Sequence, residues 1–159
     1  MGPFRISWVG LGFLLALLVP NLLWTRYPPQ GCDPSMESRG LRVLERVGQV
    51  WVTCAALVLP ESAGRPPSPW SWWLIAAVGV MILYEFWWVR YFRGERTLAN
   101  FTAGLLGIPV AGAALPVLAF FLLGIYRRAV WMLLGVVVLV IGHIGIHLQH
   151  RKRARNDVR

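Results

Sequence analysis

Residues 70–92 read WSWWLIAAVGVMILYEFWWVRYF, and this stretch decides the fold. Three tryptophans open it and two close it. At about 1.5 Å per residue, the apolar run between them can cross the roughly 30 Å hydrocarbon core of a bilayer. Tryptophan gathers at membrane–water interfaces, so the stretch predicts a transmembrane helix over about 70–90. Glu85 interrupts the run, and because a carboxylate at this depth is costly to desolvate, it is a candidate functional residue.

The composition of the whole chain is that of a membrane protein. Of its 159 residues, 57% are hydrophobic and 14% are charged, which excludes an ordinary water-soluble domain. The net charge of +9 rests on fifteen Arg and one Lys, placed in the loops and the tail. Such residues are typical of cytoplasmic loops that contact anionic lipid headgroups. We therefore expect a lipid bilayer with anionic headgroups as the partner, and no nucleic acid.

Five apolar segments predict an all-α fold, a single integral membrane bundle of five transmembrane helices spanning residues 1–159. The spans are expected at about 6–24, 41–60, 70–90, 103–126 and 129–149, followed by a basic tail at 150–159. Arg5 precedes the first apolar run as in a signal peptide. No small-residue cleavage site follows it, so we expect this segment to remain as the first span.

Charge asymmetry predicts the orientation of the bundle. With the tail in the cytoplasm, twelve of the sixteen basic residues lie inside and four lie outside. The N-terminus is then outside and the C-terminus cytoplasmic, as in a multi-pass protein of the bacterial plasma membrane. Cys32 is expected in a cytoplasmic loop and Cys54 in the outer half of the second span, too far apart to form a disulfide.

Polar residues concentrate in the inner halves of the predicted spans. In the second span a stripe of about 100° carries charged and polar side chains, and such a stripe cannot face lipid. Together with polar residues of the other spans, it predicts a cytoplasm-facing polar cavity. The predicted ligand-binding residues are Asn21, Glu45, Gln49, Glu85, His143 and His147.

Several roles for these residues stay open at this stage. His143 and His147 lie on one edge of a helix, where they would hydrogen-bond a Glu, relay protons or, with a carboxylate, bind a metal ion. Glu45 would form a salt bridge to Arg42 or Arg46, or it would line the cavity as a ligand-binding residue. Glu85 has no suitable charge nearby in sequence, so it requires a partner from another helix. His150 adjoins the tail and is expected to contact headgroups. Whether a metal or cofactor is bound is left open.

The predicted fourth span carries glycine, alanine and proline. Pro109 and Pro116 predict bends. A small-residue surface, which in lipid lets helices approach closely, predicts a homo- or hetero-oligomer contact on this Gly/Ala face. The residues of that surface are Gly104, Gly107, Ala111 and Gly112.

Several stretches carry a resemblance to known proteins. They are PNLLWTRYPP (20–29), ERVGQV (45–50), PWSWWL (69–74), LYEFWWVRYF (83–92), FLLGIY (121–126) and GHIGIHLQHRK (142–152). Through them the chain resembles a family of small bacterial multi-span membrane proteins. The resemblance implies a compact bacterial membrane bundle and no particular activity. The likeness to the tryptophan-rich sensory protein/translocator family stops at size and composition.

Three classes of function fit these patterns. The first is a protein that binds, and in one version transports, a small cationic or amphipathic molecule in the predicted pocket. The second is a structural or accessory subunit of a membrane complex, which requires only packing surfaces. The third is an intramembrane enzyme built on His and Glu with a metal ion. No catalytic motif supports the third, so we expect the chain not to be an enzyme.

Overall fold

The computed structural model describes residues 6–29, 37–58 and 68–156, and this part of the chain is all-helical, without a β-strand. The elements are α1 (Trp8–Arg26), α2 (Arg39–Val58), the 3₁₀ turn η2 (Pro69–Ser71), α3 (Trp72–Arg93), α4 (Leu98–Phe101), α5 (Ala111–Arg127) and α6 (Val130–Asn156). Three of them are long and apolar enough to cross a membrane: α1, η2 with α3, and α6 up to Lys152. The protein is therefore membrane-embedded, and α5 is a shorter apolar helix.

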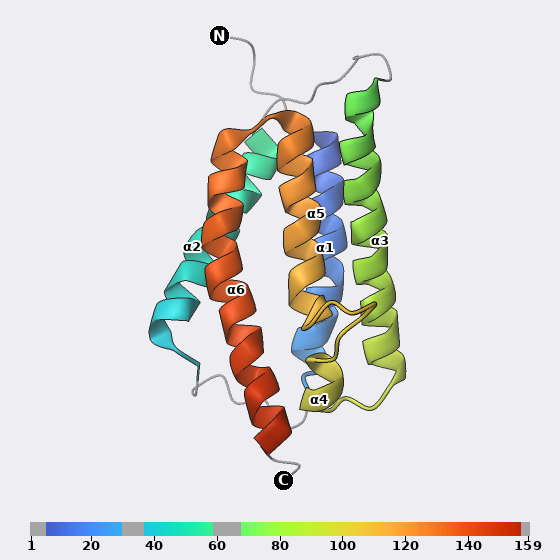
Figure 1. Ribbon diagram of the computed structural model, residues 1–159, viewed down its shortest axis with the longest axis vertical. Coiled ribbons are helices and arrows are strands. Elements are labelled where there is room, and N and C mark those ends of the chain that lie inside the picture. Colours follow the sequence, from blue (N-terminus) through green and yellow to red (C-terminus); the bar gives the residue numbers. More distant parts are fainter. Residues whose placement is uncertain (1–5, 30–36, 59–67, 157–159) are drawn as a thin grey trace.

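The long helices alternate in direction (Figure 1). We call the end where α1, α3 and α6 begin the upper end, and the end where they finish the lower end. α2 packs mainly on α6, and α3 packs mainly on α5. α1 completes the bundle beside α2 and α3, and α4 lies at the lower end (Figure 1).

Glycines set the spacing between α2 and α6. A Cβ added at Gly48 would lie 2.6 Å from Leu139 Cα, and one added at Gly142 would lie 2.3 Å from the backbone N of Glu45. No side chain fits at such distances, so the two backbones touch directly. Close backbone approach through small residues is the usual way in which helices associate in lipid.

The upper end is held by Ser7 and Arg127. The Ser7 hydroxyl caps α1 by accepting from Gly10 N at 2.9 Å, and Ser7 N donates to Leu57 O at 3.1 Å. The Arg127 guanidinium donates to Ala56 O at 2.8 Å and to the Ser7 hydroxyl. These bonds join α1, α2 and α5 at one level.

The predicted fourth span differs from the observed helix. α5 begins at Ala111, whereas residues 102–110 form a connection in which Leu105 and Ile108 exchange two backbone hydrogen bonds, at 3.1 and 2.9 Å. Leu106 and Gly107 both have positive φ, as in a tight type I′ turn. Pro109 has no N–H and disfavours helical geometry in the residue before it, so the apolar sequence does not continue as a helix.

The small residues of this segment also have another role. Ala111 and Gly112 are buried inside the bundle, and a Cβ at Gly112 would lie 2.4 Å from the Trp87 ring. Gly104 and Gly107 lie in the connection before α5. Ala111 and Gly112 thus pack within the chain, and the predicted oligomer contact of this face stays a prediction.

The tryptophans divide into two groups. Trp8, Trp72 and Trp131 at the upper end are 67–74% exposed, as expected of an interfacial belt. Trp87 and Trp88 are 1% and 4% exposed. The prediction that this second pair marks the inner interface is therefore wrong, since both rings belong to the core.

Replacing Gly142 with Ala is expected to lower the free energy of unfolding by about 1–3 kcal/mol, because the added methyl group overlaps the α2 backbone. Gly79 on α3 is the matched control, since a Cβ there meets nothing within 4 Å. Gly79→Ala should be neutral or slightly stabilising. Unfolding in mixed detergent micelles, followed by tryptophan fluorescence, measures both changes. Equal stability of the two variants would contradict the close contact of α2 and α6.

Candidate functional site

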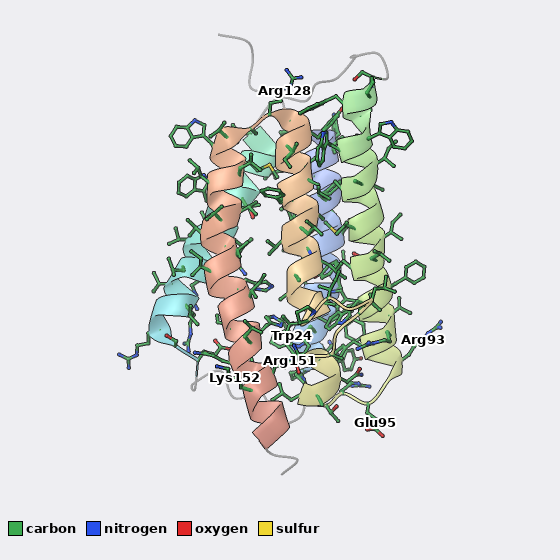
Figure 2. The ribbon with its side chains drawn as sticks, viewed as in Figure 1. Trp24, Arg93, Glu95, Arg128, Arg151 and Lys152 are labelled. Carbon is green, nitrogen blue, oxygen red and sulfur yellow. The ribbon has the colours of Figure 1, made fainter. Side chains whose placement is uncertain are left out.

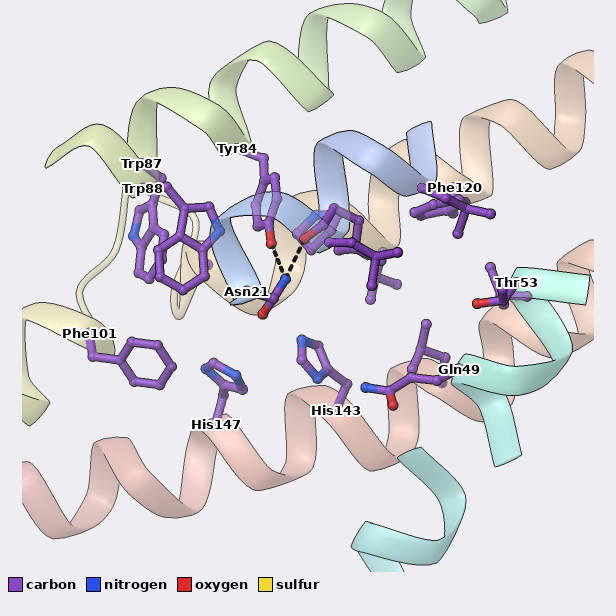
Figure 3. A pocket seen from close by; sticks show the side chains of 18 residues that line it. Asn21, Gln49, Thr53, Tyr84, Trp87, Trp88, Phe101, Phe120, His143 and His147 are labelled. Carbon is purple, nitrogen blue, oxygen red and sulfur yellow. Dashed lines mark hydrogen bonds between the residues drawn. The ribbon is translucent and has the colours of Figure 1, made fainter. Parts of the chain in front are cut away.

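A cavity of about 340 Å³ lies inside the bundle. Side chains of all five long helices and of α4 line it, and Figure 3 shows several of them converging on one space. Its volume falls at the lower end of the range for small-molecule sites, about 300–1,000 Å³. The lining residues are Leu14, Leu17, Leu18, Asn21, Gln49, Val52, Thr53, Tyr84, Trp87, Trp88, Phe101, Gly112, Pro116, Val117, Phe120, Leu139, His143 and His147.

An aromatic wall covers the lower part of the cavity. The Trp87 and Trp88 rings meet edge to face with their centroids 5.0 Å apart, and Phe101 lies 5.9 Å from Trp87. Trp87 Nε1 donates to Ala103 O at 3.4 Å. The Arg90 guanidinium donates to Asn100 Oδ1 at 3.1 Å and holds the connection in place. The rings of this wall thus pack on one another, and the Trp87 indole is also tied to the backbone.

Asn21 and Tyr84 bring polar groups to the cavity from α1 and α3. Asn21 Nδ2 donates to Leu17 O at 2.6 Å and to the Tyr84 hydroxyl at 2.8 Å (Figure 3). Both N–H bonds of the amide are therefore used, and its Oδ1 remains an acceptor. The Tyr84 hydroxyl accepts from Asn21 and keeps its own hydrogen for donation.

His143 is oriented by a carboxylate from α2. Its Nδ1 lies 2.5 Å from Glu45 Oε1, with the two side chains 21% and 19% exposed. A carboxylate accepts, so Nδ1 carries the hydrogen, and Nε2 of the neutral ring is an acceptor. The ring points from α6 toward Asn21 (Figure 3). The close contact of α2 and α6 thus fixes the position of a histidine in the cavity.

His147 projects from α6 into the same space (Figure 3). Its ring centroid lies 4.8 Å from that of His143 and 5.1 Å from that of Phe101. The side chain is 9% exposed, and within the described part of the chain its Nδ1 has no hydrogen-bond partner. A buried ring nitrogen without a hydrogen-bond partner lowers the stability of the fold unless a bound molecule or a water supplies that partner.

Five of the six predicted site residues come together here. Asn21, Gln49, His143 and His147 line the cavity, and Glu45 contacts it through His143. Glu85 is absent from the lining, although its buried Oε1 has no hydrogen-bond partner among the described residues. The expectation that Glu85 faces the cavity is therefore corrected. Its neighbour Tyr84 points inward, and successive helical residues diverge by about 100°.

The structure also gives partners to Glu45, Arg42 and His150. Glu45 bonds to His143, whereas Arg42 lies 3.5 Å from Glu37. His150 Nε2 lies 3.0 Å from Glu37 Oε1, and its side chain is buried. In place of the predicted headgroup contact, His150 thus contacts Glu37, which lies just before α2.

A metal site would require a third ligand near the two histidines. Across residues 6–29, 37–58 and 68–156, no group of three or more His, Cys, Asp or Glu side chains is placed to hold a metal ion. Cys54 is exposed, and Cys32 lies outside the described residues. The chemistry that the described side chains offer is hydrogen bonding beside apolar and aromatic surface.

Comparisons with known proteins add no analogy. No family model, curated protein or solved structure matches the chain. The function is therefore argued from the geometry of the cavity.

Sequence reasoning missed the aromatic wall and Tyr84. Trp87 and Trp88 had the position of a membrane belt, and Phe101 fell between two predicted spans. A usable signal was the spacing of Tyr84, Trp87, Trp88 and Tyr91, which repeats every three to four residues and marks one buried helix face. Thr53 belonged to the polar stripe of the second span but was not selected.

Glu45→Ala and His143→Ala should each lower the free energy of unfolding by about 1–3 kcal/mol, because each leaves a half-buried partner unpaired. The double variant should lose less than the sum of the two, with a coupling of about 0.5–3 kcal/mol. Glu85→Ala combined with His143→Ala is the control cycle and should be additive within about 0.5 kcal/mol. Additivity in the first cycle, measured in the same micelles, would contradict the observed pair.

Proposed function

We propose that this protein binds a small amphipathic molecule within the membrane. One observation carries the proposal: a cavity of about 340 Å³ with apolar walls, on which hydrogen-bonding side chains converge from α1, α2, α3 and α6. A few convergent polar groups in an otherwise apolar cavity are typical of ligand sites. The place of His147 in the lining supports it, because this residue adds a polar ring to the cavity beside His143.

The charges around the cavity favour a neutral ligand over a cation. None of the described residues that line it is Asp or Glu. Glu45 is engaged by His143, and Glu85 lies outside the lining. A cation would have to leave water without a carboxylate beside it, which is unfavourable in a low-dielectric site.

We further propose five crossings of a bacterial plasma membrane, with the N-terminus outside and the C-terminus in the cytoplasm. The alternating directions of the long helices support this arrangement (Figure 1). α2 would cross because its polar edge faces α6 and the cavity. Arg93, Arg151 and Lys152 lie at the lower end, which is then the cytoplasmic end (Figure 2).

Single cysteines test this topology in a Cys32→Ser, Cys54→Ser background. Ser38 and Ser68 are exposed at opposite ends of the bundle. A membrane-impermeant maleimide applied to intact cells should label Ser68→Cys and should reach Ser38→Cys only after permeabilisation. The reverse pattern would invert the orientation. Labelling of both positions from one side would show that α2 does not cross.

A substitution that fills the cavity tests the binding function. Val117 lines the cavity and is 5% exposed, whereas its neighbour Leu118 is 40% exposed and outside the lining. We expect wild-type protein in native nanodiscs to retain an amphipathic molecule, identified by mass spectrometry of its solvent extract. Val117→Phe should lose that molecule and Leu118→Phe should keep it.

His147→Phe tests the polar part of the site in the same preparation. The substitution keeps a ring beside Phe101 and removes both ring nitrogens, so retention of the molecule should fall about tenfold or more, equivalent to about 1.4 kcal/mol. An empty wild-type cavity would contradict the proposal and favour a structural or accessory subunit.

A further inference from the structure

Two residues that line the cavity are also exposed on the outside of the bundle. Leu18 of α1 is 49% exposed, and Gln49 of α2 is exposed as well. The lining residues of α3, α4 and α5 are all buried. Its most exposed lining residues thus lie on α1 and α2, which places the opening of the cavity between these two helices.

α1 and α2 are joined at their upper ends. A Cβ at Gly10 would lie 1.9 Å from Ala56 O, so the two backbones touch there. Arg127 and Ser7 bond across the same level. Leu18 and Gln49 lie below this contact. The cavity separates these two residues from the lining residues of α3, α5 and α6.

The opening lies at the depth of the membrane interior. Leu18 comes ten residues after the start of α1 at Trp8, and Gln49 comes ten residues after the start of α2 at Arg39. Because the two helices run in opposite directions, both residues lie about 15 Å from the helix ends. Lipid chains, and not water, surround a membrane-spanning helix at this depth.

The polar groups behind the opening select a type of head group. In the neutral form of His143, Nε2 is an acceptor because Nδ1 donates to Glu45, and Asn21 Oδ1 is an acceptor because both amide hydrogens are already donated. The Tyr84 hydroxyl has a hydrogen to donate. A hydroxyl group can donate its one hydrogen to either of these acceptors and accept from Tyr84, and it brings no charge into the membrane.

We propose that the cavity takes a neutral, lipid-dissolved alcohol or phenol, which reaches it sideways from the bilayer through the opening between α1 and α2. Its hydroxyl group bonds beside His143 and Asn21, and its apolar part lies against the aromatic wall. This inference rests on the proposed binding function and adds the ligand class and the route.

A photoreactive lipid alcohol tests both parts. The protein is reconstituted in liposomes and mixed with liposomes that carry a diazirine derivative of hexadecanol. Samples are irradiated at increasing times, and peptide mass spectrometry locates the adducts. Tyr84, Trp87 and Phe120 are each 1% exposed and line the cavity, so adducts there report a probe inside it.

Tryptophan substitutions at the rim test the route. Leu18→Trp and Gln49→Trp should slow labelling of the cavity residues about tenfold, because access then needs a conformational change. Val19→Trp and Val50→Trp are the matched controls, since these neighbours are 55% and 65% exposed and do not line the cavity. The controls should label at the wild-type rate, and melting temperatures confirm that all four variants fold.

The outcomes separate the route, the head group and the binding function. Cavity labelling that is as fast in both rim variants as in the controls would overturn lateral access and leave the pocket standing. Equal labelling by a hexadecyl trimethylammonium diazirine would overturn the neutral hydroxyl head. Adducts confined to lipid-facing residues in the wild type, together with an empty native cavity, would overturn the proposed function itself.

Discussion

The direct contact between the backbones of α2 and α6 is the constraint on which the rest of the structure depends. Gly48 and Gly142 leave no room for a side chain between the two helices. At this distance Glu45 reaches His143 and forms a 2.5 Å contact. This contact turns the polar edge of α2 toward α6, as the proposed crossing of α2 requires.

Asn21 and His143 use only some of their polar atoms in hydrogen bonds within the protein. Asn21 uses both N–H bonds, and His143 uses Nδ1, each within the protein. What remains is a small set of acceptors and donors directed at one space. Because an unpaired polar group in hydrocarbon costs several kcal/mol, this set is a strong attraction for a matching ligand.

Packed aromatic rings form one wall of the cavity. Trp87 and Trp88 are fixed by edge-to-face packing and by the fit of Gly112 against the Trp87 ring. Flat rings that brace one another leave space that flexible aliphatic chains would fill. The connection before α5 carries the wall, since Ala103 and Asn100 bind Trp87 and Arg90. The residues before Ala111, which were predicted to be the first part of the fourth span, thus hold the aromatic wall in place.

The sequence by itself determined the helical class and the membrane setting, and it pointed to four of the residues that line the cavity, because apolar run length and the cost of buried polarity are local properties. Only the tertiary structure decided which partners meet. Periodicity cannot tell that Glu45 pairs with His143 across 98 positions, or that Glu85 turns away from the cavity. Nor can it distinguish an interfacial tryptophan from a core one, because both stand near the end of an apolar run. That distinction depends on whether another helix packs there, which only the assembled bundle shows.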